Sequence, residues 1–285
     1  AVFGYLAAVA LSVAVMLFGR EINGSKRWLA LGPFSFQPSE FAKVALILFL
    51  ADLVTKNVKT IGKMWTLCRI MFWILPIVGL VGASNLSTAI IILGIGVILI
   101  FVASPKYAQF ALMGLAGACF MGIFLALESY RLERLAIWRN PEKYEKGYQT
   151  LQGLYAIGSG GVFGVGLGNS VQKLGFVPEA QNDMIFSIIC EELGLAGAGI
   201  IVFLFLLLIW RFFMIASGSR DLFGALIATG AMAHMMIQVI LNIAVVTNTI
   251  PNTGITLPFI SYGGTSVMFL LIEMGLVLSV SQVVD

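Results

Sequence analysis

The chain has 285 residues, of which 59% are hydrophobic and only 11% are charged, and its mean hydropathy is +0.98. An ordinary globular domain carries about 25% charged residues, so this composition excludes most soluble folds. The formal net charge of +3 and the single histidine exclude a basic field for nucleic acid and a histidine cluster for a transition metal. We therefore expect an all-α, polytopic transmembrane helical protein.

Long apolar runs predict where the membrane helices lie. A helix needs roughly 20 residues to cross a hydrocarbon core about 30 Å thick. We expect helices over residues 1–18, 40–54, 69–83, 87–104, 107–127, 183–216, 222–247 and 264–282, which make 1–285 a single transmembrane domain. The sixth range is too long for one upright span, so its first turns should project from the lipid core or line a protein cavity.

A long polar segment, 128–182, separates the fifth and sixth helices. Loops of this length are usually functional or disordered. Within it, residues 148–157 keep Leu151, Leu154 and Ile157 at helical spacing, which predicts a short amphipathic helix before a run of glycines. The total count of Lys and Arg is higher on the side of the membrane that carries this loop, which opposes an extracytoplasmic loop. The dense basic run over 56–69 lies on the opposite side and favours that opposite side as the cytoplasmic one.

Charged residues occur at two places where an apolar helix is expected to exclude them. Glu40 and Lys43 are three residues apart on one helix, so they share a face. They form either a local ion pair or a functional pair, in which Lys43 serves an anionic substrate or a distant carboxylate. Asp183 directly precedes an apolar helix, where it is either an N-cap or a general base.

Polar residues occur at three further places in the C-terminal half of the chain. Glu191 and Glu192 follow Asp183 by about two turns and are expected to be structural hydrogen-bond partners. The segment 247–266 is rich in proline and glycine, so it forms a re-entrant turn or exposes backbone N–H groups to a ligand. His234 is isolated among apolar residues and is expected to be a hydrogen-bonded core histidine.

Six ordered motifs together resemble one family, the bacterial SEDS proteins (shape, elongation, division and sporulation), which include RodA, FtsW and SpoVE. The motifs are Asn-Gly-Ser-Lys-Arg-Trp at 23–28, Gln-Pro-Ser-Glu-Phe-Ala-Lys at 37–43, the 147–166 run, Pro-Glu-Ala-Gln-Asn-Asp at 178–183, Glu-Glu-Leu-Gly at 191–194 and Pro-Phe-Ile-Ser-Tyr-Gly-Gly at 258–264. Family members have ten helices, so the eight expected here correspond to the third to the tenth, with the N-terminal two missing.

Two departures from the family pattern bear on substrate contacts. Asn85 stands where relatives commonly have Asp, and Asn182 stands where a Thr often precedes the key Asp. The Asn-Leu-Ser-Thr sequence at 85–88 is more similar to the division and sporulation branch, FtsW and SpoVE, than to the elongation branch.

The resemblance implies a peptidoglycan glycosyltransferase in the bacterial cell membrane, with its active site and large loop on the extracytoplasmic face. Such an enzyme polymerises lipid II with inversion, forms β-1,4 linkages and releases undecaprenyl pyrophosphate, during division, elongation or sporulation. The implied partners are lipid II with its polyprenyl tail, a monofunctional class B penicillin-binding protein transpeptidase and other divisome or elongasome membrane proteins, without nucleic acid.

The resemblance also assigns roles to residues. Asp183 matches the essential Asp, which would take the proton of the acceptor hydroxyl, and Lys43 and Glu40 match its motif partners. We expect Lys43 to lower the pKa of Asp183. The expected substrate-binding residues are Arg27, Arg134, Gln149, Gln152, Lys173, Glu179, Ser261, Gly263 and Gly264. Arg27, Lys43, Arg134 and Lys173 are the cations expected at the pyrophosphate. A divalent cation, Mg or Mn, could share that work, although the sequence has no dedicated ligand cage.

Two alternatives use the same resemblance. A lipid II flippase would carry polar residues along the bilayer midplane, whereas here only Glu192, His234, Asn242 and Glu273 are expected to lie deep. A scaffold that only recruits a transpeptidase would not need Asp183. The concentration of polarity on one face favours the enzyme.

Overall fold

A computed structural model describes the chain except for residues 23–24, 32–33, 107, 112–113, 115–134 and 283–285. Helices make up most of the described residues, which confirms the predicted all-α class. The chain forms two compact units, and each is described by itself. Unit 1 comprises 1–109, 208–237 and 263–285, and unit 2 comprises 110–207 and 238–262.

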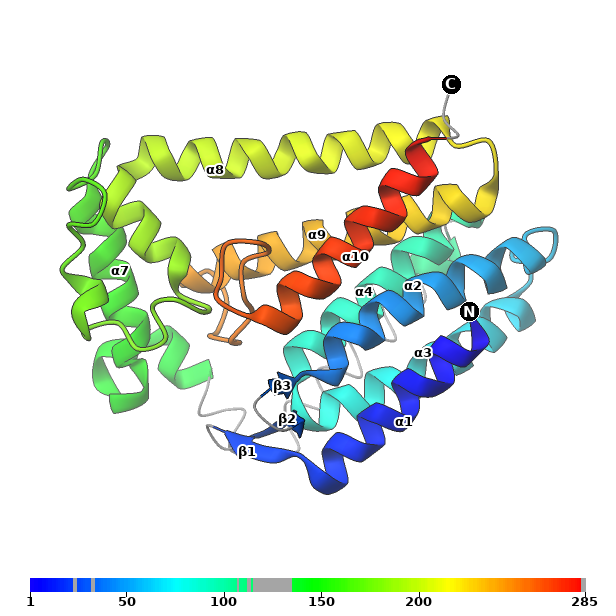
Figure 1. Ribbon diagram of the computed structural model, residues 1–285, viewed down its shortest axis with the longest axis horizontal. Helices are drawn as coiled ribbons and strands as arrows, with labels where there is room; N and C mark the ends of the chain where they lie inside the picture. The colour runs from blue at the N-terminus through cyan, green and yellow to red at the C-terminus, as the bar shows by residue number, and fades with distance from the viewer. Residues whose placement is uncertain (23–24, 32–33, 107, 112–113, 115–134, 283–285) are drawn as a thin grey trace. The chain divides into compact units, whose positions relative to one another are not determined.

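Unit 1 is built on four consecutive helices and the last one. They are α1 (Val2–Phe18), α2 (Pro38–Asn57), α3 (Met64–Ser84), α4 (Leu86–Ala103) and α10 (Gly264–Ser281). Helix α2 contacts all four of the others, and α3 packs along α4 (Figure 1). As a result α2 is the most enclosed helix of this group, and its buried residues include Glu40 and Lys43 as well as aliphatic side chains.

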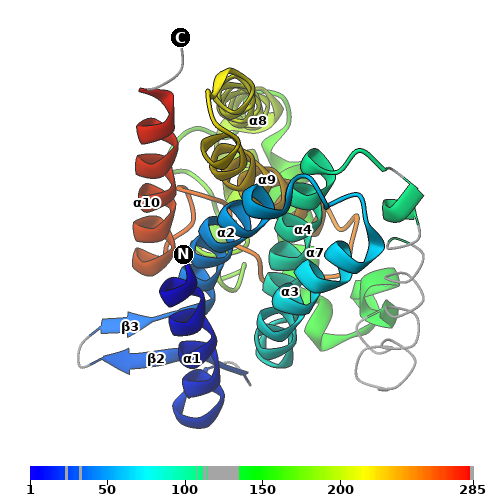
Figure 2. The same cartoon turned by 90° about the vertical axis from the view of Figure 1, so that its right-hand side faces the viewer.

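A small antiparallel sheet joins α1 to α2, and it was not predicted. Its strands β1 (Arg20–Ile22), β2 (Ser25–Leu31) and β3 (Phe34–Phe36) pair in the order β1-β2-β3. Strand β2 also contacts α1 (Figure 2). The sequence did hold a signal for it, because the dipeptide Asn23-Gly24 is typical of a two-residue hairpin connection.

Unit 2 contains α7 (Tyr148–Gly160) and three short 3-10 turns, η1 (Pro141–Lys143), η2 (Glu145–Gly147) and η3 (Gln172–Leu174). Helix α7 lies where the sequence predicts a short helix in the long loop. Two long helices, α8 (Ile185–Gly218) and α9 (Leu222–Val246), each contribute one part to unit 2 and the rest to unit 1.

Helix α8 is broken at Gly194, whose backbone has φ 67° and ψ −171°. Such angles are essentially restricted to glycine. A Cβ atom at this position would lie 2.3 Å from the backbone nitrogen of Gly164, in the loop that follows α7. Glycine is therefore required here both for the backbone angles and for the close approach of the loop.

The loop after α7 satisfies the backbone groups that the break sets free. In an unbroken helix the N–H groups of residues 195 and 196 would donate to the carbonyls of 191 and 192. Instead, the N–H groups of Leu195 and Ala196 donate to the carbonyls of residues 161 and 162, at 2.9 and 3.0 Å. The carbonyls of 191 and 192 in turn accept from residues 165 and 166, at 3.0 Å each. We call this exchange of four hydrogen bonds the α8 latch.

The predicted spans agree with most of the observed helices. Five described helices, α3, α4, α8, α9 and α10, are long and apolar enough to cross a membrane, and α1 is a shorter apolar helix. Helix α2 covers the range expected for the second span. The fifth expected span, 107–127, lies mostly outside the described residues.

Candidate functional site

Asp183 lies two residues before α8, in unit 2, and is 8% exposed. Its Oδ1 atom is 3.4 Å from the Nε2 atom of Gln149, in the first turn of α7. Its backbone carbonyl accepts a hydrogen bond of 2.8 Å from the side chain of Asn242, a fully buried residue of α9. Two helices distant in sequence therefore fix the position of this carboxyl.

Burial raises the pKa of Asp183 to about 6. The negative charge of Glu179, on the same loop, raises it further, whereas the hydrogen bond from Gln149 acts in the opposite direction. Lys43 belongs to unit 1, so the expected effect of Lys43 on this pKa stays a prediction. A carboxyl of this kind is ionised at neutral pH and is still a moderately strong base.

The loop that carries Asp183 is held by the segment after α9. The hydroxyl of Ser261 donates to the carbonyl of Asn182 at 2.6 Å and accepts from the N–H of Leu257 at 2.7 Å. The N–H of Tyr262 donates to the carbonyl of Gln181 at 2.8 Å. Ser261, predicted to bind substrate, is thus 7% exposed and engaged in supporting the Asp183 loop.

Gln149 is a second predicted residue that the structure brings to Asp183. Its Nε2 atom also donates to the carbonyl of Pro178 at 3.2 Å, and its Oε1 atom accepts from Asn252 at 3.1 Å. Gln152 lies one turn further along α7 and is half-buried. Asn252 was not predicted as part of the site, because nothing in the segment 247–266 shows which amide side chain hydrogen-bonds Gln149.

Glu179 is exposed, has a positive φ of 54° and accepts a hydrogen bond from the side chain of Asn182. Its influence on the site is electrostatic, through the charge that it places near Asp183.

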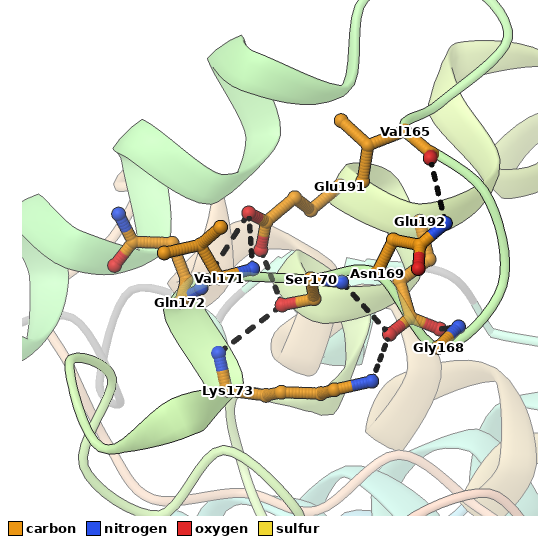
Figure 3. A network of polar contacts seen from close by, with 9 residues as sticks. All are labelled: Val165, Gly168, Asn169, Ser170, Val171, Gln172, Lys173, Glu191 and Glu192. Atoms are coloured by element: carbon orange, nitrogen blue, oxygen red, sulfur yellow. Dashed lines mark hydrogen bonds and ion pairs between the residues drawn. The ribbon is translucent and has the colours of Figure 1, made fainter.

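Lys173 lies in a different polar network, centred on the two carboxylates that follow the α8 N-terminus. Its Nζ atom is 2.6 Å from Oε1 of Glu192 (Figure 3). Glu192 also accepts from the N–H groups of Gly168 and Ser170, at 3.0 and 3.3 Å. Glu191 accepts from the hydroxyl of Ser170 and, at 3.1 Å, from the N–H of Val171. This network binds the loop 168–173 to α8, next to the latch.

The structure shows what these three side chains bind, and this bears on two predictions. The two glutamates are structural hydrogen-bond partners, as expected, but they bind the backbone of the loop. Lys173 is paired with Glu192 in the structure, and its predicted role at the pyrophosphate stays a prediction.

The predicted residues of unit 1 form a separate polar group. Lys43 and Glu40 are 1% and 6% exposed, and their Nζ and Oε1 atoms are 2.9 Å apart. His234 and Glu273 are each 2% exposed and form a second buried pair at 2.8 Å. The Glu40–Lys43 ion pair, one of the two alternatives for these residues, is observed, and so is the hydrogen-bonded core histidine. A functional role for Lys43 stays a prediction. The buried charged pair of Glu40 and Lys43 is costly, which marks this part of α2 as more than a lipid-facing helix.

The other predicted residues take varied positions. Arg27, on β2, donates from Nε to the carbonyl of Ser84 at 3.1 Å and lines a small cavity with Ser39 and Asn85. Gly263 and Gly264 form the N-terminus of α10. Arg134 lies outside the described residues. Among the residues that the structure describes, no group of three or more His, Cys, Asp or Glu could hold a metal ion, so the divalent cation stays a prediction.

Comparison with known proteins connects this site to a family. The family model for FtsW, RodA and SpoVE, described as cell cycle protein, matches residues 1–285. The chain belongs to the FtsW/RodA/SpoVE family. This result confirms the resemblance that the six motifs carry, and with the five long apolar helices it makes the chain a multi-pass protein of the plasma membrane.

Curated relatives cover nearly all of the chain. Stage V sporulation protein E of Bacillus subtilis (strain 168) is 43% identical over 275 residues, which are 93% of this chain and 73% of that protein. The probable peptidoglycan glycosyltransferase FtsW of Thiomicrospira cyclica is 36% identical over 283 residues, which are 97% of this chain and 73% of that protein.

Solved structures of the family resemble the chain as well. One comes from a study of the structural coordination of polymerization and crosslinking by a peptidoglycan synthase complex. It matches with a TM-score of 0.85 and 31% identity, and the match covers 98% of this chain and 80% of that one. The rod shape determining protein RodA of Thermus thermophilus has a TM-score of 0.70, 30% identity and coverage of 98% and 76%.

Proposed function

We propose that this chain is a peptidoglycan glycosyltransferase that polymerises lipid II on the extracytoplasmic face of the membrane. Its membership of the family and the names of its FtsW relatives support the activity. The observation that carries the catalytic assignment is the buried carboxyl of Asp183, oriented through Oδ1 and having a pKa of about 6.

In the proposed reaction, the Asp183 carboxylate accepts the proton of the acceptor sugar's 4-hydroxyl. The hydroxyl oxygen forms a bond to the anomeric carbon of the donor chain from the face opposite the leaving group, so the configuration inverts. The bond from that carbon to the pyrophosphate oxygen breaks, and undecaprenyl pyrophosphate departs with the electron pair. A base whose pKa lies just below the working pH is mostly ionised and still takes the proton readily.

Cations are expected where negative charge develops on the pyrophosphate. Arg27 and Arg134 are the proposed groups for this role. Lys43 and Lys173 fit it less well, because a carboxylate already accompanies each of them, Glu40 and Glu192 respectively. A divalent cation would supply the same charge neutralisation if it binds.

We further propose that a crosslinking enzyme works with this chain. The structure with a TM-score of 0.85 belongs to a complex that coordinates polymerization and crosslinking. A class B penicillin-binding protein transpeptidase is the proposed partner, alongside other divisome or elongasome membrane proteins.

The flippase alternative has less support. The polar residues expected to lie deep serve the fold: His234 pairs with Glu273, and Asn242 donates to the carbonyls of Asp183 and Ile255. Glu192 binds the loop backbone and Lys173. A substrate path across the bilayer needs polar groups that can exchange these contacts for contacts with the lipid headgroup.

The test compares the full-length protein with its Asp183→Asn variant, each purified with the cognate transpeptidase and supplied with lipid II. Asp221→Asn is the matched control, since Asp221 is an exposed residue that binds the N–H of Gly224 at 2.9 Å and Asn can replace that acceptor. We expect glycan strands from the wild type and the control, and none from Asp183→Asn. Equal polymerisation by all three would refute the catalytic assignment. Transfer of lipid II across vesicles without polymer would support the flippase.

A further inference from the structure

A chain of hydrogen bonds leads from the backbone of Gly254 to the carboxyl of Asp183. The N–H of Gly254 donates to Oδ1 of Asn252 at 3.1 Å. Nδ2 of Asn252 donates to Oε1 of Gln149 at 3.1 Å, and Nε2 of Gln149 lies 3.4 Å from Oδ1 of Asp183. All four residues belong to unit 2, and they come from three segments of the sequence.

The direction of this chain is fixed at its first member. A side-chain amide has a donor end and an acceptor end, and which end points where follows from its neighbours. The backbone N–H of Gly254 can only donate, so Asn252 must turn its oxygen toward Gly254 and its NH₂ group toward Gln149. Gln149 must then present its oxygen to Asn252 and its NH₂ group to Asp183. The carbonyl of Pro178, which accepts from the same NH₂ group at 3.2 Å, favours this orientation as well. Asn252 contributes the donor that holds the oxygen end of the Gln149 amide.

Local geometry maintains the first link. The bond from residue 254 to the side chain of residue 252 closes a turn of the kind that Asn and Asp favour. Gly254 has φ 67°, which an L side chain rarely adopts, and a Cβ there would lie 3.7 Å from Oδ2 of Asp183. Gly254 is therefore the first donor of the series of hydrogen bonds and also lies next to Oδ2 of Asp183.

We propose that Asn252 is a positioning residue for the glycosyl transfer: it holds the oxygen end of the Gln149 amide, so that the NH₂ end stays on Oδ1 of Asp183 and leaves Oδ2 for the acceptor hydroxyl. Asn252 acts through Gln149 and touches no reacting atom. The inference rests on the proposed function, because it assigns Asn252 to the base of that reaction.

The charged surroundings of Asp183 sharpen the prediction. Glu179 already disfavours the carboxylate, and burial does so more strongly, whereas the hydrogen bond from Gln149 favours it. Loss of the oriented amide should therefore raise the pKa of Asp183 and require a higher pH for activity. A purely structural role for Asn252 would lower activity equally at every pH.

The experiment measures kcat/KM for lipid II polymerisation against pH with the full-length protein. Asn252→Leu removes both the donor and the acceptor, whereas Asn252→Ser keeps an acceptor for Gly254 without adding charge and is too short to donate to Gln149. Thr249→Val is the control in the same segment, because Thr249 is exposed and its side-chain hydroxyl hydrogen-bonds that of Thr247 at 3.0 Å. For a pKa of Asp183 raised by about one unit, we expect about twofold lower activity at pH 7 and nearly tenfold lower activity at pH 5 in both Asn252 variants, with recovery at alkaline pH and an unchanged profile for the control.

A double-mutant cycle tests whether Asn252 acts through Gln149. If it does, Asn252→Leu combined with Gln149→Met should be no less active than Gln149→Met alone. Additive losses, an unshifted pH profile or wild-type activity in Asn252→Leu would overturn the inference. If Asn252→Leu fails to fold, the uncharged Asn252→Ser carries the same test. Activity in Asp183→Asn would instead refute the proposed function itself, so the two failures are distinguishable.

Discussion

Replacement of Gly194 by alanine tests the α8 latch. The backbone at residue 194 has φ 67° and ψ −171°, and an added Cβ would lie 2.3 Å from the nitrogen of Gly164 and 2.5 Å from the carbonyl of Val162. Neither atom can move without disturbing the loop, because both belong to its backbone. Gly194→Ala therefore either strains the break or straightens the helix.

Both outcomes have a similar free-energy cost. Holding alanine in a backbone conformation restricted to glycine costs about 1–3 kcal/mol. Straightening α8 breaks the four hydrogen bonds of the latch and restores two within the helix, so two are lost, at about 0.5–1.5 kcal/mol each. With the steric conflict added, we expect a loss of about 2–4 kcal/mol in the free energy of unfolding.

The assay is thermal unfolding of the purified protein in detergent, with hydrogen exchange of the peptide that contains residues 165 and 166. Gly199→Ala is the matched control: it lies in the same helix and has no atom within 4 Å of the added Cβ, so it should be neutral or slightly stabilising. For Gly194→Ala we expect a melting temperature lower by about 5 °C or more and faster exchange at 165 and 166. Unchanged melting and exchange in Gly194→Ala would refute the latch.

Four further predictions concern Asp183 and two buried polar residues of unit 1, Asn85 and Glu273. Polymerisation by the wild type should fall about tenfold per pH unit below pH 6, because the base must be ionised; a pH profile measures this. Because the pKa of Asp183 is raised in the folded state, the wild type loses stability as pH rises from about 4 to 6. Asp183→Asn should therefore have a free energy of unfolding higher than that of the wild type at pH 7.5 by on the order of 3 kcal/mol, which thermal unfolding measures. Asn85→Ala should cost about 1 kcal/mol, since the Asn85 side chain caps α4 by accepting from the N–H of Thr88 at 3.2 Å. Glu273→Leu should cost about 3–5 kcal/mol, because it leaves the His234 side chain buried without its carboxylate.

Each of these has a control or a contrary result. Activity that is flat down to pH 4 would exclude Asp183 as the titrating base, and a stability gap that does not close between pH 6 and 4 would contradict its raised pKa. Asn85→Asp keeps an acceptor for Thr88 and should retain the stability that Asn85→Ala loses. Combining Glu273→Leu with His234→Phe should recover part of the loss, and no recovery would mean that the cost comes from packing.

The helices were predictable because membrane spans are set by the local length of apolar sequence. The Glu40–Lys43 pair was predictable for the same reason, since its members are three residues apart on one helix. By contrast, Lys173 and Glu192 are 19 residues apart and meet only because the loop folds back on α8. Their pairing depends on tertiary structure that hydropathy does not report.

The sequence also identified the neighbourhood of Asp183 without its details. Gln149 and Asp183 were both selected, and the structure places their side chains together. Asn252 and Asn242 were not selected as parts of the site, since an amide gains its role from the particular donors and acceptors around it. The break at Gly194 was missed because glycine within an apolar helix is common, and only the position of the loop shows that it is needed.

The α8 latch also has a consequence for biosynthesis. Residues 161–166 leave the ribosome before residues 191–196, so the loop that completes the hydrogen bonding is present when the broken part of α8 emerges. With the opposite chain order, α8 would emerge first and could pair residues 195 and 196 with the carbonyls of 191 and 192 as an unbroken helix, which would have to reopen before the latch forms. We therefore expect a circular permutant that starts between the loop and α8 to reach the folded state more slowly, even though every final contact is preserved.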